Sequence, residues 1–325
     1  MLQFKLKNDD KKWNLFVNEQ MDNQLITIAH NPSLAAILGK SFNVKAKKII
    51  IEKNNLIIGI FPIVSIKNKV ISIPHFSYGD ILFAGNLKEK QKLRNKIIGK
   101  KYEIRSFESF SKYFDDSKIM SYLELKNSEE EQWKYWKSKL RSQIRKGVKN
   151  GVTIKIGHAE YLYDFYKIYS RNMHDLGSPV LSYRFFKNIM NLYDYGEAKI
   201  FLAQKGEKYI AASLILTYHN FAEVCWASSL RKYNSTNANM VLYWEMIKYC
   251  VQHKYKYFSF GRSTKNSNIH KFKKQWSPEE KQLYFNYSSE PKINIKKLSF
   301  LANIWRNLPL FITNRIGPFF AKRIY

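Results

Sequence analysis

Residues 152–287 carry the pattern that most restricts the fold, because helices and strands follow one another there without alternating strictly. Tight turns at Lys205-Gly206-Glu207 and His219-Asn220 separate three of the apolar runs. The resulting order is β-α-α-β-β-β-α-β-α-β, which argues against a plain doubly wound sheet and predicts a mixed α/β (α+β) fold. We expect strands at 152–156, 199–204, 209–218, 221–228, 255–260 and 282–287, helices at 160–176, 183–193 and 238–253, and a short segment around 270–276.

Within this region, residues 255–276 contain the most side chains that could bind or react with a substrate. Its aromatic strand is expected to break at Gly261. Arg262, Ser263 and Thr264 then open a polar loop, and the basic and aromatic segment His270–Trp276 follows. A strand that delivers Arg, hydroxyls and Lys to its carboxyl end is where an α/β protein binds an anion or a reacting carbonyl. The alternative is an exposed basic loop in a Lys-rich chain.

The first 127 residues predict a separate mixed α/β unit. Two apolar runs, 48–52 and 56–65, flank Lys53-Asn54-Asn55 and indicate a β-hairpin, with a bulge or an edge position suggested by Gly59 and Pro62. A further strand at 70–73, the turn-rich segment 74–80 and a basic helix at 87–101 follow. The unit is long enough to bury a core of its own.

A helix with a basic second half should join the two regions. Ser128 and Glu131 form a capping box, and Trp133, Trp136, Leu140, Ile144 and Val148 follow at helical spacing up to Gly151. The late turns carry Lys137, Arg141, Arg145, Lys146 and Lys149. They indicate either a surface for tRNA or a lipid pyrophosphate, or a solvated helix face.

The last 35 residues, 291–325, form a basic amphipathic tail that Pro309 and Pro318 should split into short pieces. Apolar and aromatic residues alternate there with Lys and Arg. This composition fits an interfacial membrane segment, but a terminal helix that packs on the preceding domain is the alternative that we favour.

The formal net charge of +29 favours anionic partners such as RNA, lipid phosphate or nucleotide-sugars. Part of this charge reflects the abundance of Lys, Asn, Ile, Tyr and Phe that an AT-rich genome produces. The two cysteines, Cys225 and Cys250, lack metal-ligand spacing, and we expect no metal site. No secretory leader and no membrane-spanning run is evident, so we expect a cytoplasmic protein, with peripheral contact at the inner membrane face as the alternative.

Several motifs together resemble the FemAB-like family, the peptidoglycan-bridge aminoacyltransferases and their relatives. They are Tyr169–Pro179 (YSRNMHDLGSP), Asn239–Glu245 (NMVLYWE), Phe258–Ser263 (FSFGRS) and Phe272–Trp276 (FKKQW). Weaker likeness covers 72–79, 140–151 and 305–317, so the resemblance spans most of the chain. The chain is most similar to the branch encoded with exosortase and exopolysaccharide systems.

The resemblance implies two GNAT-like domains with mixed central sheets, at residues 1–127 and 128–290, followed by the tail 291–325. It implies transfer of an acyl or aminoacyl group to an amine or hydroxyl of a lipid-linked or nucleotide-linked glycan precursor of peptidoglycan or exopolysaccharide. The donor would be aminoacyl-tRNA or acyl-CoA, with no tightly bound cofactor. Residues 230–237 stand where CoA-dependent relatives have a glycine-rich pyrophosphate loop, and they contain no glycine, which counts against CoA.

Two alternatives stay open at this stage. One is an acyl-CoA-dependent N-acetyltransferase, and the other is an RNA- or membrane-binding protein without catalysis, which the charge alone would explain.

By motif match, Phe272 and Lys273 are the pair at the reacting centre, where the Lys steadies the charged intermediate. A compact cation in a partly dry pocket stabilises an oxyanion far more than it would in water. The alternative is that Lys273 is one of three exposed lysines. Asp175 and His174 are the candidate bases, although Asp175 at a turn before Gly177 could equally be a structural cap.

The remaining candidates would bind substrate. Arg171 and Asn172 lie in the same motif as the bases, and Arg262 and Ser263 lie at the end of a strand, where Arg suits phosphate or carboxylate. Tyr243 sits on the helix after the loop, and Tyr78 would line an acceptor groove in the first domain. For Tyr243 the alternative is a core position, and for Tyr78 it is a plain turn.

Overall fold

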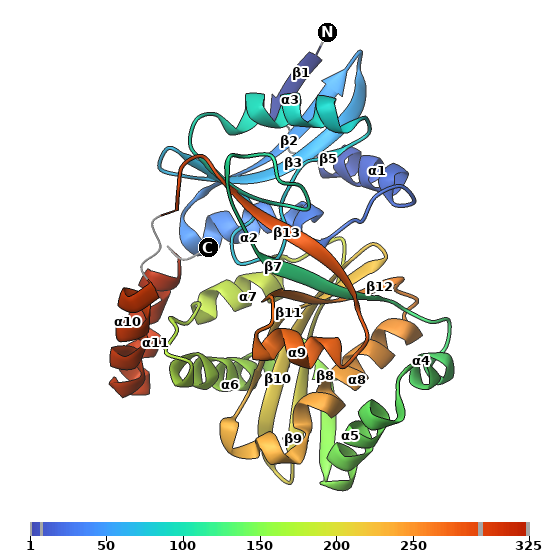
Figure 1. The fold of residues 1–325 in the computed structure, drawn as a ribbon, viewed down its shortest axis with the longest axis vertical. Coiled ribbons are helices and arrows are strands. Elements are labelled where there is room, and N and C mark those ends of the chain that lie inside the picture. The colour runs from blue at the N-terminus through green and yellow to red at the C-terminus, as the bar shows by residue number, and fades with distance from the viewer. Residues whose placement is uncertain (1, 7–8, 292–294, 323–325) are drawn as a thin grey trace.

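A computed structural model describes residues 2–6, 9–291 and 295–322, with side chains described in 9–291 and 300–322. Its centre is one sheet of 13 strands that runs through the whole molecule (Figure 1). The strands of the first half are β1 (Leu2–Leu6), β2 (Lys45–Lys53), β3 (Leu56–Ile66), β4 (Lys69–Ile71), β5 (Leu82–Phe83), β6 (Tyr102–Ser106) and β7 (Tyr113–Glu124). Those of the second half are β8 (Val152–Gly157), β9 (Ala198–Lys205), β10 (Lys208–Tyr218), β11 (Phe221–Ser229), β12 (Tyr257–Thr264) and β13 (Glu279–Tyr287).

The sheet is mixed, as the sequence predicts. Its strand order is β1-β2-β3-β4-β6-β13-β7-β12-β11-β10-β9-β8, and β5 pairs with β3. The pairs β4–β6 and β11–β12 are parallel, and the other pairs are antiparallel. The order of elements from β8 to β13 matches the predicted one, and the mixed α/β class is confirmed.

The last strand, β13, ties the two halves of the sheet together. It lies between β6 and β7, with Phe285 opposite Arg105 on one side and Gln282 opposite Ile119 on the other. Residues from the C-terminal part of the chain therefore complete the first half of the sheet. The division at 127/128 stays a prediction, because the sheet is continuous across it.

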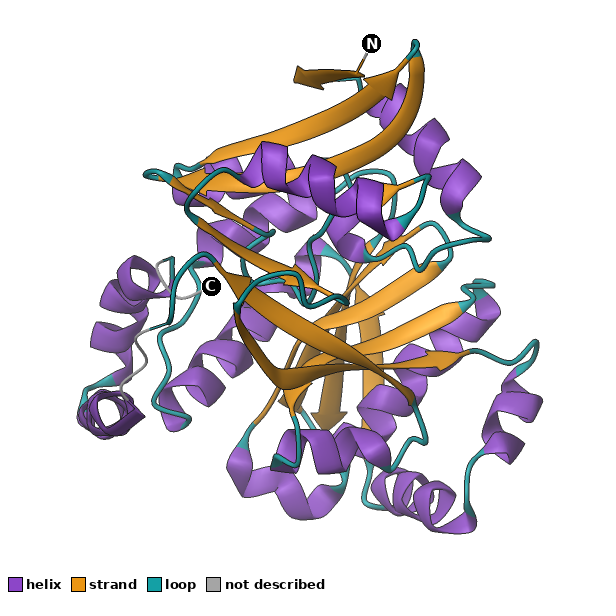
Figure 2. Cartoon of the chain, turned by 45° about the horizontal axis from the view of Figure 1, so that its top comes forward, coloured by secondary structure: helices purple, strands orange, loops and turns teal. Residues whose placement is uncertain are grey.

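Helices cover both faces of the sheet (Figure 2). Along β9 the side chains alternate between two buried cores: Leu202 faces the core shared with α6 and α7, while Phe201 and Ala203 face the core shared with α5 and α8. This alternation is what a strand buried on both faces requires. The long helices are α1 (Asp10–Gln20), α2 (Ser33–Phe42), α3 (Leu87–Ile98), α5 (Ser138–Lys149), α6 (Leu162–Asp175), α7 (Tyr183–Leu192), α8 (Ala238–Gln252), α10 (Ile295–Asn307) and α11 (Leu310–Ala321), and the shorter ones are α4 (Glu129–Tyr135) and α9 (Asn268–Lys274).

Three features predicted from short sequence motifs, a turn, a bulge and a helix cap, are confirmed by the structure. Asn54 and Asn55 both take positive φ in the β2–β3 turn, which is the geometry of a two-residue hairpin. The pairing shifts register opposite Gly59, which confirms the predicted bulge. Ser128 caps α4 by accepting a hydrogen bond from the backbone N–H of Glu131.

Four expectations about boundaries were wrong. The helix expected to run from Ser128 to Gly151 is two helices, because Trp136 and Lys137 take extended backbone that buries the Trp136 ring. Pro318 lies inside α11 and does not split it. The last strand begins at Glu279, three residues before the expected start. Strand β12 does not break at Gly261 but continues to Thr264.

Candidate functional site

The site is built around an irregularity in strand β12. Its pairing with β7 shifts register between Ser259 and Arg262, and Gly261 takes a φ of +69°. A Cβ at Gly261 would lie 3.2 Å from the carbonyl oxygen of Val224, so both the backbone angle and the space favour glycine. A bulge frees backbone groups from the ladder, and the carbonyl groups of Gly261 and Arg262 are both directed at one side chain.

That side chain is Lys273, in the last turn of α9. Ser267 caps this short helix by accepting from the backbone N–H of His270, and the buried ring of Trp276 fixes its other end. Lys273 is only 3% exposed, and its Nζ donates to the carbonyl oxygens of Gly261 and Arg262, each at 2.8 Å. The neighbouring Lys271 and Lys274 are exposed. The interpretation of Lys273 as one of three exposed lysines is therefore wrong.

A buried carboxylate on β11, Glu223, organises the bulge. It accepts hydrogen bonds from Ser77 Oγ at 2.9 Å and from Ser259 Oγ at 3.2 Å. Each hydroxyl in turn accepts from the bulge backbone: Ser259 from the N–H of Gly261 at 3.0 Å, and Ser77 from the N–H of Arg262 at 3.1 Å. Glu223 thus holds, through two hydroxyls, the two residues whose carbonyls bind Lys273.

Burial shifts the pKa values of both Lys273 and Glu223. Burial lowers the pKa of Lys273 to about 7, with Glu223 acting to raise it and Arg262 to lower it further. Burial raises the pKa of Glu223 above its ordinary value, against the effect of its two serine hydrogen bonds and the nearby Lys273 and Arg262. A lysine whose pKa lies near neutral pH is typical of functional sites.

A loop from the first half, residues 72–80, closes the cluster. Arg262 Nη1 donates to the carbonyl oxygen of Phe76, and Arg105 Nη1 donates to the same oxygen at 2.8 Å. Burial lowers the pKa of Arg105 to about 9, with Arg262 as a second cause. Burial likewise lowers the pKa of His75 to about 3, reinforced by Arg105 and Arg262. His75 is therefore neutral, and the cluster carries more positive than negative charge.

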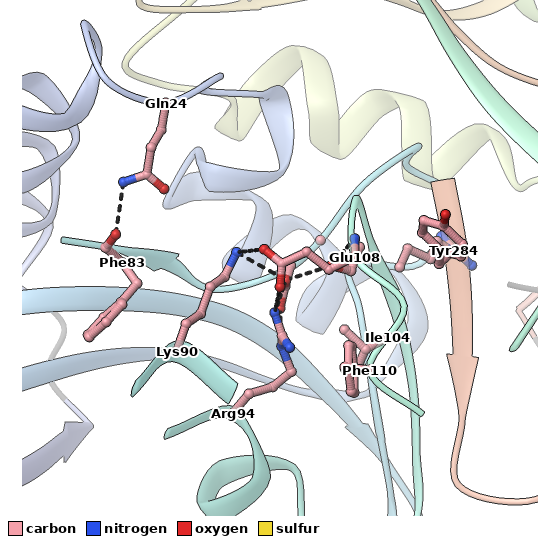
Figure 3. A network of polar contacts seen from close by, with 12 residues as sticks. Gln24, Phe83, Lys90, Arg94, Ile104, Glu108, Phe110 and Tyr284 are labelled. Atoms are coloured by element: carbon pink, nitrogen blue, oxygen red, sulfur yellow. Dashed lines mark hydrogen bonds and ion pairs between the residues drawn. The ribbon is translucent and has the colours of Figure 1, made fainter. Parts of the chain in front are cut away.

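The far end of this loop is anchored by a second polar network, shown in Figure 3. The buried Arg94 donates to Asp80 Oδ1 and Oδ2 at 2.9 and 2.7 Å and to Glu108 at 2.8 Å, and Lys90 also donates to Glu108. Although burial acts to raise it, the pKa of Asp80 is held below its ordinary value by Arg94 and Lys90. A hollow of about 560 Å³ borders Lys90 and Glu108. By anchoring Asp80, the network fixes the position of the loop end next to Ser77 and Tyr78.

The Tyr243 ring of α8 packs on Phe272, which precedes Lys273 in the chain. The Tyr243 ring meets Phe272 edge-on at 5.1 Å and stacks on Phe260 at 5.7 Å, measured between centroids. Burial raises the pKa of Tyr243, which stays neutral.

Ser263 is buried, and its Oγ has no hydrogen-bond partner among the described residues. Tyr78 is buried against Phe107 at 4.3 Å. Lys273, Phe272, Tyr243, Arg262 and Ser263 thus lie in one neighbourhood, and Tyr78 belongs to the loop that closes it.

The other predicted residues lie elsewhere, at the end of α6. Asp175 pairs with Arg171 at 3.1 Å, and Asn172 donates to Ser228 at 3.2 Å. His174 Nε2 lies 2.8 Å from the carbonyl oxygen of Leu308 in the tail. The contacts of this group run to the tail and to the loop after β11, where Arg231 donates to the Asp175 carbonyl oxygen. A catalytic role for His174 or Asp175 stays a prediction.

Arg141 and Arg145 occupy a third place, on α5. This helix lies so close to α8 that a Cβ at Gly147 would be 2.4 Å from Val241 Cγ2. Arg145 is exposed over the ring of Trp133, and Arg141 is half-buried. The glycine-free loop 231–236 forms a short 3-10 helix just before α8. A role for these arginines in binding a donor also stays a prediction.

Sequence reasoning missed Glu223, Ser77, Ser259 and Arg105. One signal was present: Glu223 is the only acidic residue in the otherwise apolar or small strand sequence FAEVCWASS. A carboxylate in a strand buried on both faces needs partners there. The identity of those partners depends on the loop 72–80, which is about 150 residues away in the sequence, and no local pattern reports it.

No group of three or more metal-ligating side chains occurs in the described part of the chain. Within the same ranges, no helix is long and apolar enough to cross a membrane.

Comparison with known proteins agrees with this architecture. Residues 136–274 match the Acetyltransferase (GNAT) domain family. The crystal structure of FemX is similar over 92% of this chain and 100% of its own, with a TM-score of 0.64 at 12% identity. No curated protein sequence matches.

Two further structures share the fold at similar distance. L-PGS from Bacillus licheniformis is 11% identical over 93% of this chain and 98% of its own, with a TM-score of 0.55. A tandem GNAT protein from the clavulanic acid biosynthesis pathway is 9% identical over 90% of this chain and 100% of its own, with a TM-score of 0.54. The fold therefore extends over nearly the whole chain, and the domain match lies in its second half. The chain thus shares its fold with FemX, and its residues 136–274 are similar to the GNAT acetyltransferase domain family.

Proposed function

We propose that this protein is an acyl- or aminoacyltransferase in which Lys273 stabilises the oxyanion formed at the reacting carbonyl. The observation that carries the proposal is the geometry of Lys273, which is buried at 3% exposure and held by two bulge carbonyls at 2.8 Å. A buried lysine without an ion pair is uncommon, because removing its charge from water costs several kcal/mol, and groups with such strongly shifted pKa values cluster at functional sites.

The hydrogen bonds explain how Lys273 acts in its charged form. An ammonium has three N–H donors, and two of them point at the Gly261 and Arg262 carbonyls. Our proposal assigns the third to the developing oxyanion. The neutral amine would use both of its N–H groups on the same carbonyls and leave only a lone pair, so it could not stabilise negative charge.

The transfer is a nucleophilic substitution at the donor carbonyl. The lone pair of an acceptor amine or hydroxyl attacks that carbonyl, and the C=O electrons move to oxygen, beside the Lys273 ammonium. Collapse of the tetrahedral intermediate breaks the bond to the leaving group, which departs as the thiolate of CoA or the ribose alkoxide of tRNA. The acceptor's proton passes to that leaving group, so the chain itself need supply no dedicated base.

The surroundings of α8 support our choice of donor. In GNAT proteins the phosphates of acyl-CoA bind at the amino end of a helix that follows a glycine-rich loop. Here the loop Leu230–Asn237 has no glycine and bends as a 3-10 helix, with Thr236 Oγ1 accepting from the N–H of Ala238 at 3.3 Å. One amide of the helix start is thus already used. This, together with the basic helix α5, favours aminoacyl-tRNA over acyl-CoA.

The acceptor we propose is a lipid-linked or nucleotide-linked glycan precursor of the cell envelope, in peptidoglycan or exopolysaccharide synthesis. FemX has the same fold over nearly the whole chain. The positive charge of the half-buried Arg262, next to that of the buried Arg105, suits the pyrophosphate that links such glycans to their carrier. Work on such a precursor would place the protein in the cytoplasm.

The test supplies lipid-linked glycan and compares charged tRNA with acetyl-CoA as donor, with and without ribonuclease. We expect transfer from charged tRNA that ribonuclease abolishes. Activity with acetyl-CoA that survives ribonuclease would exclude tRNA and support the CoA-dependent alternative. Salt-sensitive RNA binding with no transfer from either donor would contradict the enzymatic proposal.

A further inference from the structure

Helix α11 turns its small side chains towards the core and its large apolar side chains towards solvent, which is the reverse of the usual arrangement. Its buried residues are the small Thr313, Gly317 and Ala321, spaced four apart on one stripe. Its exposed side carries Phe311, Ile316, Phe319 and Phe320, with Phe311 72% exposed. A surface helix of a soluble domain normally shows the opposite arrangement.

Helix α10 adds to the same exposed surface. Phe300, Leu301 and Ile304 are 64%, 48% and 44% exposed at helical spacing. The Trp305 ring meets the Phe320 ring edge-on at 5.9 Å, which joins the two helices. Figures 1 and 2 both show α10 and α11 as a pair at the edge of the molecule, outside the layers that cover the sheet.

The pair is attached to the body through close contacts on its small-residue side. A Cβ at Gly177, after α6, would lie 2.5 Å from the carbonyl oxygen of Ala302, and a Cβ at Gly317 would lie 2.8 Å from Val180 Cγ1. His174 and the Leu308 carbonyl add a hydrogen bond. The orientation of α11 is therefore fixed by packing, and exposure of its aromatic side is built into the fold.

The charge of this segment indicates what covers the exposed side. Residues 295–322 contain five Lys or Arg and no Asp or Glu. Arg306 and Arg315 are exposed, Arg306 also donating to the carbonyl oxygen of Leu176. Lys322 Nζ lies 4.9 Å from the centre of the Phe319 ring. Aromatic and aliphatic residues with basic neighbours and no acidic ones match the boundary between acyl chains and anionic headgroups.

We propose that α10 and α11 form a surface that docks the protein on an anionic membrane. The helices lie in the plane of the interface, since neither is long enough to span the bilayer. A second copy of the chain is a poorer occupant, because pairing two such surfaces would bring like charges together. The proposal stands on the tail residues and does not depend on the identity of the donor or acceptor.

The test is co-sedimentation of the full chain with vesicles of phosphatidylcholine alone and of phosphatidylcholine with about one third phosphatidylglycerol. We expect binding to the anionic vesicles only. The double variant Phe311→Gln/Phe319→Gln should weaken that binding by about 30-fold or more, because two aromatic side chains leave the acyl boundary. Arg315→Gln alone should weaken it by about fivefold.

The control changes two exposed apolar residues away from the tail, Leu56→Gln/Tyr163→Gln, which are 71% and 68% exposed in the native chain, against 72% and 49% for Phe311 and Phe319. This variant should bind vesicles as the native protein does. Circular dichroism and the melting temperature of each variant verify that it is folded. Lys273→Ala should also bind normally, so that loss of catalysis and loss of docking are separate results.

Three results would overturn the proposal. One is equal binding to neutral and anionic vesicles, and another is full vesicle binding by the Phe311→Gln/Phe319→Gln variant. The third is the absence of any vesicle binding, with a dimer in sedimentation equilibrium that dissociates in the same variant. That last outcome would assign the surface to a second copy.

Discussion

The neighbourhood of Lys273 and the end of α6 both carry titratable residues from family motifs, yet they differ in solvent exposure and in how their polar groups are linked. Lys273 and Glu223 are each 3% exposed and are linked through Ser77, Ser259 and two backbone carbonyls. At the end of α6, the Arg171–Asp175 pair has a half-exposed arginine. Such a pair contributes little free energy, whereas a buried network fixes geometry and shifts pKa values.

The two regions also differ in what they connect. The Lys273 network joins β11, β12 and α9 to the loop 72–80 of the first half. The end of α6 joins the body to the tail through His174 and Leu308. This difference favours the first as the reacting centre and the second as a structural attachment.

The largest expected effect separates the two regions directly. Lys273→Ala should lower the turnover rate by about a thousandfold, because it removes the only donor that we assign to the oxyanion. Lys271→Ala and Lys274→Ala, which change exposed neighbours, should each stay within about twofold. Steady-state rates with the donor that supports transfer measure this, and a Lys273→Ala enzyme working at the native rate would refute the assignment.

The Glu223→Gln variant should lower the turnover rate by about 10- to 100-fold and also change its pH dependence. Activity that needs the Lys273 ammonium is present below the pKa of about 7 and is lost as pH rises through it. Because the Glu223 carboxylate acts to raise that pKa, its removal should move this alkaline decline to lower pH. A purely structural role for Glu223 would lower the rate at every pH and leave the midpoint unchanged.

The bulge itself is tested by Gly261→Ala. The backbone angle of +69° and the 3.2 Å approach to the Val224 oxygen should cost about 1–3 kcal/mol of unfolding free energy. The control is Gly206→Ala in a surface turn, which also has positive φ but no atom within 4 Å of its Cβ. It should cost about 1 kcal/mol or less. Denaturant unfolding compares them, and equal costs would show that the close contact is unimportant.

The smallest effect on catalysis is expected at the end of α6. His174→Ala and Asp175→Asn should each change the turnover rate by less than about threefold. His174→Ala should instead speed amide hydrogen exchange in α10 and α11, because it removes the hydrogen bond to Leu308. If either variant instead turned over about a hundredfold more slowly, with normal exchange in the tail, this end of α6 would be part of the reacting centre.

The sequence predicted the parts of this picture that depend on local chemistry. Hydrophobic periodicity located the strands and helices from β8 to β13, and the Asn54-Asn55 turn and the Ser128 cap are short-range signals. The Phe272-Lys273 pair came from its motif, and neither periodicity nor spacing would have chosen Lys273 over Lys271 or Lys274.

What the sequence could not provide are features set by distant contacts. The extension of β12 past Gly261 depends on Ser77 and on pairing with β7. The break at Trp136 depends on the carbonyl of Trp276, to which the Trp136 Nε1–H donates at 2.9 Å. The insertion of β13 between β6 and β7 joins segments more than 150 residues apart. Local propensity is overridden at each of these places by tertiary packing.

The central claim is that Lys273 is a buried amine whose pKa is lowered by burial and raised in part by Glu223, and titration of that one amine tests it most directly. The ¹⁵N resonance of Lys273 Nζ, assigned by its loss in Lys273→Ala, would be followed against pH in the native protein and in Glu223→Gln. We expect a pKa near 7 in the native protein and a lower one in Glu223→Gln. A native value close to that of a solvated lysine, unchanged in the variant, would contradict the account.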